Sequence, residues 1–271
     1  MQALIYLLVV RTPNVIYKPL LDYRERVEDI ARNFESNPES LALYRRVTDD
    51  VDPGRVLALQ QKYASQLADF DPISLFKYAD LPYWLYHKIA TAKELGLDKG
   101  EAKTILDIGM GAGHFAAVCQ ALGHTVVGTD IRVPLYDDIC EVLQVDRRIE
   151  PTRYRTPLAD LGMTFNVITI IWQVFHVLRV LGNGDREHWT TEDWSYFLQD
   201  LIANHMRYPG MIFLHLNPNV MSAGEAFDAP LLQWSRDHGA KVEAALGKIT
   251  FERVLGWESL VAGPEAQAPV D

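Results

Sequence analysis

The spacing of apolar positions changes near residue 103. Between residues 14 and 72, apolar side chains recur every three or four positions, as at Val56, Leu59 and Tyr63, which is the period of an amphipathic helix. Proline is disfavoured inside helices, and prolines interrupt this stretch at positions 38, 53 and 72. The pattern predicts several short helices, then a further helix over 81–95 that ends at Gly96.

From residue 103 onward, short apolar runs alternate with amphipathic segments. Four runs are rich in β-branched residues and apolar on both faces, at 104–108, 125–129, 167–171 and 211–216, as in the buried centre of a parallel sheet. Thr190 opens a helix with a capping-box-like sequence. A last helix is predicted over 229–246 and a last strand over 249–254. The alternation indicates an α/β fold built from βα units.

The two ends of the chain have patterns of their own. The apolar run Ala3–Val10 is followed by Arg11 and Pro13; it lacks a basic n-region and is far shorter than the ~20 residues that span a bilayer. We interpret it as an edge strand or a buried first helix, with a self-association or membrane-surface segment as the alternative. Residues 261–271 are predicted to form a flexible tail.

Composition narrows the class of protein. Of 271 residues, 48% are hydrophobic and 23% are charged, as in an ordinary soluble globule. Lys and Arg number 26 against 36 Asp and Glu, for a net charge of −10, so nucleic acid is not an expected partner. Two cysteines without a CxxC motif fit a reducing compartment. We expect a cytoplasmic protein without integral membrane association.

The stretch 105–115 (ILDIGMGAGHF) carries the clearest candidate chemistry. A predicted buried strand ends at Ile108, and Gly109, Gly111 and Gly113 follow before a helix begins. Glycine permits a tight turn and the close approach of a ligand, and the first amides of the helix face whatever lies above the loop. A dinucleotide-binding fingerprint needs Gly or Ala where His114 stands. The loop therefore differs from that fingerprint.

A carboxylate ends the second predicted strand, in Gly128-Thr129-Asp130, where it is well placed to accept both hydroxyls of a ribose. On these residues the sequence resembles the class I S-adenosylmethionine-dependent methyltransferases. Residues 106–113 match their first motif, hydrophobic-hydrophobic-Asp-hydrophobic-Gly-x-Gly-x-Gly, and Asp130 matches the acid that ends their second strand. The resemblance covers roughly residues 75–255.

The resemblance implies a Rossmann-like, seven-stranded, mostly parallel sheet with helices on both faces and S-adenosylmethionine over the carboxyl ends of the strands. It implies cofactor contacts from the glycine loop, its helix, the two acids and neighbouring side chains: Asp107, Gly109, Gly111, Gly113, His114, Asp130, Ile131, Lys77, Tyr78 and Trp172. For His114, simple capping of the helix is the alternative. Among these, Lys77 and Tyr78 are expected to close over the cofactor's carboxylate.

Methyl transfer from a sulfonium requires orientation and, for a hydroxyl acceptor, the removal of one proton. The loops after the fourth and fifth strands offer His176 as a candidate general base and Asn217 as a residue that orients a substrate hydroxyl. The alternative for His176 is a structural role, as a hydrogen-bonded, half-buried histidine on a short helix. Trp172 stands where catechol-type relatives place a magnesium-binding Asp, so no metal is expected.

Substrate contacts are predicted from Trp84, Arg153, Arg155 and Gln173. The two arginines belong to a basic cluster, 147–155, which is either a solvated face or a receptor for a phosphate or carboxylate on the substrate. We divide the chain into a helical extension (1–74), a methyltransferase domain (75–260) and the tail (261–271). The extension is a candidate substrate lid or homodimer surface.

The favoured function is methyl transfer from S-adenosylmethionine to a small molecule, at a hydroxyl oxygen rather than at nitrogen or carbon. Two alternatives stay open. One is a nicotinamide-dependent oxidoreductase, which His114 disfavours. The other is a catalytically silent binding or scaffold protein that keeps the fold.

Overall fold

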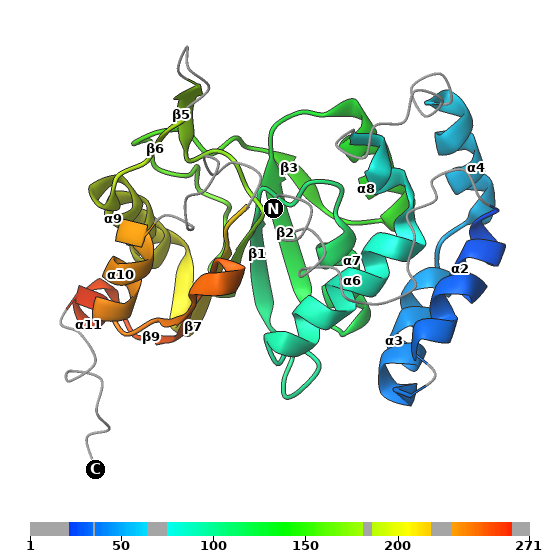
Figure 1. Cartoon of the computed structure of the whole chain (residues 1–271), viewed down its shortest axis with the longest axis horizontal. Helices are drawn as coiled ribbons and strands as arrows, with labels where there is room; N and C mark the ends of the chain where they lie inside the picture. The colour runs from blue at the N-terminus through cyan, green and yellow to red at the C-terminus, as the bar shows by residue number, and fades with distance from the viewer. Residues whose placement is uncertain (1–21, 35, 64–74, 181–185, 218–228, 262–271) are drawn as a thin grey trace. The chain divides into compact units, whose positions relative to one another are not determined.

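A computed structural model describes residues 22–34, 36–63, 75–180, 186–217 and 229–261 (Figure 1). The chain forms two compact units. The helical unit comprises Met1–Ala102, Met110–Val126 and Arg132–Arg147, and the sheet unit comprises Lys103–Gly109, Val127–Ile131 and Arg148–Asp271. The chain passes from the sheet unit to the helical unit between Gly109 and Met110, inside the glycine loop.

The helical unit begins with short helices whose starts the prolines mark. Its helices are α2 (Tyr23–Ala31), α3 (Pro38–Asp49), α4 (Pro53–Lys62), α6 (Leu81–Glu94), α7 (His114–Ala121) and α8 (Pro134–Leu143), with 3₁₀ turns η1 (Arg32–Phe34) and η2 (Leu75–Ala79). Pro38 and Pro53 are first residues of helices, where the missing N–H costs nothing. The helix breaks predicted at these two prolines are confirmed, whereas Pro72 lies outside the described residues.

Polar caps and one central helix organise this unit. The side chains of Asp22, Asn37, Asp52 and Asp80 accept hydrogen bonds from the first-turn amides of α2, α3, α4 and α6, which satisfies donors that a helix start leaves open. Helix α6 contacts α2, α3 and α7. The predicted helix over 81–95 is thus confirmed, and Gly96 follows it with a φ of +64°.

Seven strands form one sheet in the order β3–β2–β1–β4–β7–β9–β8. They are β1 (Thr104–Ile108), β2 (Thr125–Asp130), β3 (Arg147–Ile149), β4 (Phe165–Ile171), β7 (Met206–His215), β8 (Lys241–Glu243) and β9 (Lys248–Val254). Strand β4 pairs in parallel with β1 and β7, whereas β9 runs antiparallel to β7 and β8. The Rossmann-like, mostly parallel sheet is therefore confirmed, as are the four predicted central strands and the last strand.

The described part of the sheet unit also contains three helices and the hairpin of β5 (Val177–Val180) and β6 (Arg186–His188). The helices are α9 (Thr191–Asp200), which continues into the π turn η3 (Leu201–His205), α10 (Ala229–Asp237) and α11 (Trp257–Val261) (Figure 1). Thr190 and Asp193 form the predicted capping box of α9. The core joins strand residues such as Ile168 and Ile212 to Trp194 and Leu198 of α9.

The predicted helix over 229–246 is wrong in its second half. Helix α10 ends at Asp237, the chain turns at His238 and Gly239, and residues 241–243 form β8 before the 3₁₀ turn η5 (Ala244–Leu246). Gly239 has a φ of +80°, which glycine adopts readily and which ends a helix.

The ends of the chain lie largely outside the described residues. This applies to the apolar run Ala3–Val10 and to residues 262–271 of the predicted tail. The proposed division at residues 74 and 260 stays a prediction. Among the described helices, none has the length and apolar character needed to cross a membrane.

Candidate functional site

In the sheet unit, the acid of the first motif is built into the sheet. Asp107 of β1 lies opposite Thr169 of β4 in the parallel register, and the Thr169 hydroxyl donates to Asp107 Oδ1 at 2.8 Å. Both residues are buried. Two residues on, the Gly109 N–H donates to the carbonyl of Thr129 on β2 at 2.6 Å. These bonds fix the start of the glycine loop against its neighbouring strands.

Gln173 packs directly on the first glycine. Its side-chain amide donates to the Gly109 carbonyl, and a Cβ added at Gly109 would overlap the Gln173 amide. Gly109 also has a φ of +68°, so two independent constraints require glycine here. The sequence predicted Gln173 as a substrate contact, and the structure places it against the glycine loop.

Trp172 follows β4 with a φ of +58°, a conformation that bulky residues rarely adopt. Two hydrogen bonds hold its backbone. The Trp172 N–H donates to the His215 carbonyl at 2.7 Å, and Asn217 Nδ2 donates to the Trp172 carbonyl at 2.9 Å. The ring centroids of Trp172 and His215 lie 5.2 Å apart. The structure thus brings Trp172 and Asn217 together at the carboxyl ends of β4 and β7.

Asp130 ends β2 at the same edge of the sheet. Its carboxylate is half-buried and accepts the N–H of Ile131 through Oδ1 at 2.7 Å. The Ile131 side chain is 56% exposed, which is uncommon for isoleucine. An oriented carboxylate and an exposed apolar side chain therefore stand on consecutive residues.

In the helical unit, the two later glycines have different surroundings. A Cβ on Gly113 would overlap Val145 and Cys140 of the loop and helix behind it, whereas a Cβ on Gly111 would meet no atom within 4 Å. Both have positive φ, +77° and +59°. Gly113 is therefore required for packing, and Gly111 borders open space.

Helix α7 begins directly after the loop and has no side-chain cap. Its first residue, His114, is 3% exposed and its Nε2 lies 3.1 Å from the Tyr78 carbonyl, so Nε2 carries the proton and donates. Burial, together with the charge of Lys88, lowers the pKa of His114 to about 3. His114 is therefore neutral at physiological pH and links α7 to η2.

Lys77 and Trp84 complete this cluster in the helical unit. The Trp84 indole N–H donates to the Lys77 carbonyl at 2.8 Å, and Lys77 Nζ lies 5.0 Å from the Tyr78 ring centroid and 5.9 Å from that of Trp84. Burial lowers the pKa of Lys77. Four predicted site residues, Lys77, Tyr78, Trp84 and His114, therefore contact one another.

His176, the candidate base, lies in a turn before β5 and is 3% exposed. Its ring stacks on that of His188 with centroids 5.5 Å apart. Burial, together with His188, lowers the pKa of His176 to about 4. The imidazole is therefore neutral above that pH and a weak base, which supports the structural alternative for this residue.

The four arginines do not form one exposed cluster. Arg147 is buried, with 4% of its side chain exposed, and Arg148 donates to the Leu161 carbonyl at 2.7 Å. Arg155 is half exposed; it has a φ of +45° and its Nε donates to Asp193 at 2.6 Å. Arg153 is exposed. The solvated-face interpretation is wrong for Arg147, because that side chain packs inward.

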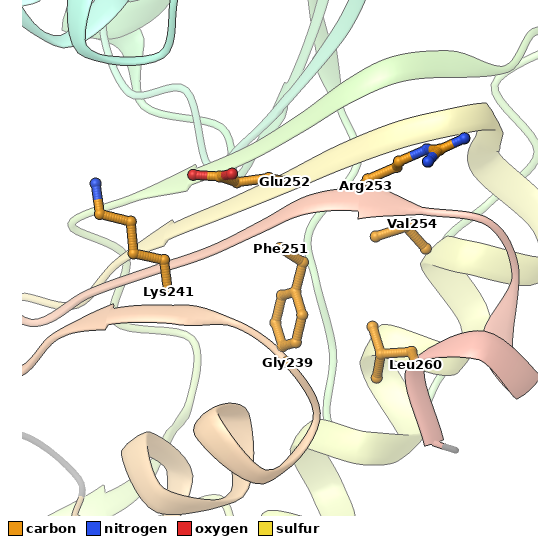
Figure 2. Close-up of a pocket in the computed structure, with 7 residues that line it drawn as sticks. All are labelled: Gly239, Lys241, Phe251, Glu252, Arg253, Val254 and Leu260. Carbon is orange, nitrogen blue, oxygen red and sulfur yellow. The ribbon is translucent and has the colours of Figure 1, made fainter. Parts of the chain in front are cut away.

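A pocket of about 370 Å³ lies elsewhere in the sheet unit, at the β8–β9 edge (Figure 2). Phe251 and Leu260 extend toward one side of β9, and Lys241 and Glu252 toward the other. Strands β4 and β7 separate β9 from β1 in the sheet order. None of the predicted site residues lines this pocket.

Within the described residues, no group of three or more His, Cys, Asp or Glu side chains is arranged to hold a metal ion.

The contacts that the sequence did not indicate are those of Gln173 with Gly109 and of Arg147 with the glycine loop. Both depend on pairing between distant segments, and no local motif marks them. The sequence predicted that Trp172 follows the end of a strand, but it did not predict the positive φ of this residue.

No protein-family model matches the sequence, and neither does any curated protein. The amino pentose methyltransferase CalS10 from Micromonospora echinaspora, solved with S-adenosylmethionine bound, is 18% identical, with a TM-score of 0.36 over 61% of this chain and 60% of that chain. DesVI from Streptomyces venezuelae is 15% identical, with a TM-score of 0.38 over 53% and 56%. A SAM-dependent methyltransferase from Archaeoglobus fulgidus is 19% identical, with a TM-score of 0.36 over 50% and 54%.

The chain thus matches less than two thirds of the length of each of these proteins. With its seven-stranded, mostly parallel sheet and accompanying helices, this chain has a Rossmann-like α/β fold.

Proposed function

We propose that this chain is an S-adenosylmethionine-dependent methyltransferase that acts on a small molecule. The observation that carries the proposal is the junction after β1. Three glycines with positive φ precede a helix without a side-chain cap, and a carboxylate, Asp130, ends the next strand. Two explanations compete for this junction: it binds an adenosyl ligand, or its glycines only turn the backbone. Open amides next to a strand-tip acid favour the ligand.

The residues present fit the cofactor by their chemistry. Gly111 leaves open space beside its α-carbon, and the Asp130 carboxylate suits the two ribose hydroxyls. The exposed Ile131 side chain offers an apolar contact for the adenine. Lys77, half-buried and next to two aromatic rings, suits the carboxylate of the methionine moiety. When bound, the cofactor supplies an electrophilic methyl group on sulfur.

The chain's own contribution is to orient the acceptor and to exclude water. We propose a hydroxyl oxygen as the acceptor atom, with Trp172 at the carboxyl end of β4 beside it. Arg155, held by Asp193 and stacked 5.6 Å from the Tyr154 ring centroid, is our candidate receptor for an anionic substrate group, with Arg153 next to it in the chain. Because His176 is buried, we propose that orientation of the acceptor contributes more to methyl transfer than proton removal by a histidine.

The first experiment is thermal unfolding with S-adenosylmethionine, S-adenosylhomocysteine or NADH. At ~100 times Kd, a ligand adds ~2.7 kcal/mol to the stability of the folded state. We expect the two adenosyl compounds to raise Tm and NADH to leave it unchanged. A rise with NADH alone would show a nicotinamide enzyme, and no rise with any of the three would favour the silent scaffold.

The matching variant is Asp130→Asn, which keeps the size of the side chain and removes its charge. We expect it to raise the Kd for S-adenosylhomocysteine at least tenfold, about 1.4 kcal/mol, in isothermal titration calorimetry. Glu252→Gln, on β9, makes the same chemical change at an exposed position and should leave the Kd unchanged. Wild-type affinity in Asp130→Asn would refute the assignment of Asp130 to the ribose.

A further inference from the structure

Arg147, the first residue of β3, joins helix α8 to the glycine loop within the helical unit. Its guanidinium forms an ion pair with Asp137 of α8, and its Nε donates to the Gly111 carbonyl at 3.2 Å. The guanidinium carbon lies 6.0 Å from the ring centroid of Tyr136. Burying an arginine is costly unless its charge and its donors are satisfied. The Asp137 carboxylate provides the countercharge, and the Gly111 carbonyl accepts the hydrogen bond from Nε.

The carbonyl that Arg147 holds belongs to the centre of a turn. The Gly113 N–H donates to the Met110 carbonyl at 3.2 Å, Gly111 has a φ of +59°, and Ala112 does not have a positive φ. This is the pattern of a type II′ turn, which favours glycine at its first central position. The turn's own hydrogen bond uses neither polar group of the Gly111–Ala112 peptide, so other contacts determine how that peptide is oriented.

The orientation of this peptide decides where its N–H points. In a trans peptide the C=O and N–H point in opposite directions. The Gly111–Ala112 peptide is trans, since among the described residues the cis peptide bond is the one between Tyr208 and Pro209. Since the carbonyl is directed at Arg147, the Ala112 N–H is directed away from it. No hydrogen bond from this N–H is found within the described ranges. A rotation of the peptide plane would reverse both groups.

We propose that Arg147 is a positioning residue for cofactor binding. It fixes the plane of the Gly111–Ala112 peptide so that the Ala112 N–H faces an acceptor group of the cofactor, beside the open space at Gly111. This inference rests on the proposed function, because it needs an adenosyl ligand above the loop. Arg147 does not contact that ligand in our proposal; it acts through the backbone of the loop.

The test compares Arg147→Gln with Arg148→Gln, the neighbouring position on β3. Arg148 also donates to a backbone carbonyl, that of Leu161, so both variants lose one such bond. We expect Arg147→Gln to raise the Kd for S-adenosylhomocysteine more than tenfold at a temperature well below unfolding. Arg148→Gln should keep the Kd within twofold, and Arg147→Lys, with fewer donors, should fall in between.

A second measurement needs no ligand. Deuterium uptake by the amides of residues 110–116 should be faster in Arg147→Gln than in wild type and unchanged in Arg148→Gln. An unchanged Kd and unchanged uptake in Arg147→Gln, whatever its Tm, would overturn the inference and leave the proposed function intact. A wild-type protein that binds no S-adenosylhomocysteine would overturn both. Faster uptake with an unchanged Kd would also refute the positioning role.

Discussion

Trp172 is a bulky residue whose backbone conformation needs support from its neighbours. A bulky residue at a φ of +58° carries strain of order 1–3 kcal/mol, which persists only where neighbouring contacts hold it. Asn217 holds it through the Trp172 carbonyl, so we interpret Asn217 as a support for Trp172 rather than as a group that activates substrate. We expect Asn217→Ala to destabilise the protein by about 1 kcal/mol, the typical value of one hydrogen bond.

The same substitution in a Trp172→Gly background should cost less, because glycine adopts a positive φ without strain. A double-mutant cycle of urea unfolding energies measures this coupling. Asn217→Asp, which keeps the shape but cannot donate, should behave like Asn217→Ala. If Asn217→Ala costs the same in both backgrounds, Asn217 does not support the strained backbone.

The glycine loop shows how far a motif predicts the roles of its residues. The sequence predicted a ligand cradle from three glycines, and all three have positive φ. Only the structure separates them, because the side chain against Gly109 comes from the loop after β4 and those against Gly113 come from α8 and the segment after it. Residue types at fixed spacing indicate a loop conformation, whereas its packing partners come from segments far along the chain.

Between elements, the pair Arg26–Asp80 joins α2 to α6. The two side chains are 2% and 0% exposed, with Arg26 Nη2 2.8 Å from Asp80 Oδ2, and Asp80 also caps α6 through the Tyr83 N–H. Removing one partner of a buried pair leaves the other charge uncompensated, at a cost of about 3–5 kcal/mol. We expect Arg26→Leu to lose stability of that order in urea unfolding.

The double variant Arg26→Leu with Asp80→Asn should lose less than Arg26→Leu alone, because asparagine is neutral and still caps a helix. Arg45→Leu provides a control on α3, since its pair with Glu28 is largely exposed, at 34% and 62%, and such pairs contribute less than about 1 kcal/mol. A double variant as unstable as Arg26→Leu would show that lost packing, and not the buried charge of Asp80, causes the effect.

Elements were predictable where a local pattern determines them. Strands β1 and β4 are apolar on both faces because both faces are covered, and Thr190 with Asp193 forms a capping box within four residues. The failures lie where tertiary pairing decides. Strand β8 has three residues and exists because it pairs with β9, and the β5–β6 hairpin is likewise too short to show a periodic pattern.

The whole molecule should lose stability in mild acid. The pKa of His114 is lowered to about 3 and that of His176 to about 4, each mainly by burial, whereas an unfolded histidine titrates near ~6.5. Above ~6.5 both states are neutral and the histidines contribute no pH dependence. Below it the unfolded state binds protons that the folded state does not, so stability falls down to about pH 4, by about 1.4 kcal/mol per pH unit for each histidine.

His114→Gln and His176→Gln should each flatten this slope by about one proton in urea unfolding between pH 4.5 and 7.5; an unchanged slope in either variant would contradict its lowered pKa.

The two histidines lie in different units, His114 in the helical unit and His176 in the sheet unit. Strand β2 begins in the helical unit and continues in the sheet unit, so we expect the units to unfold in one cooperative transition. Both substitutions should then flatten the slope of that same transition. Two transitions, each sensitive to only one substitution, would show instead that the units unfold independently.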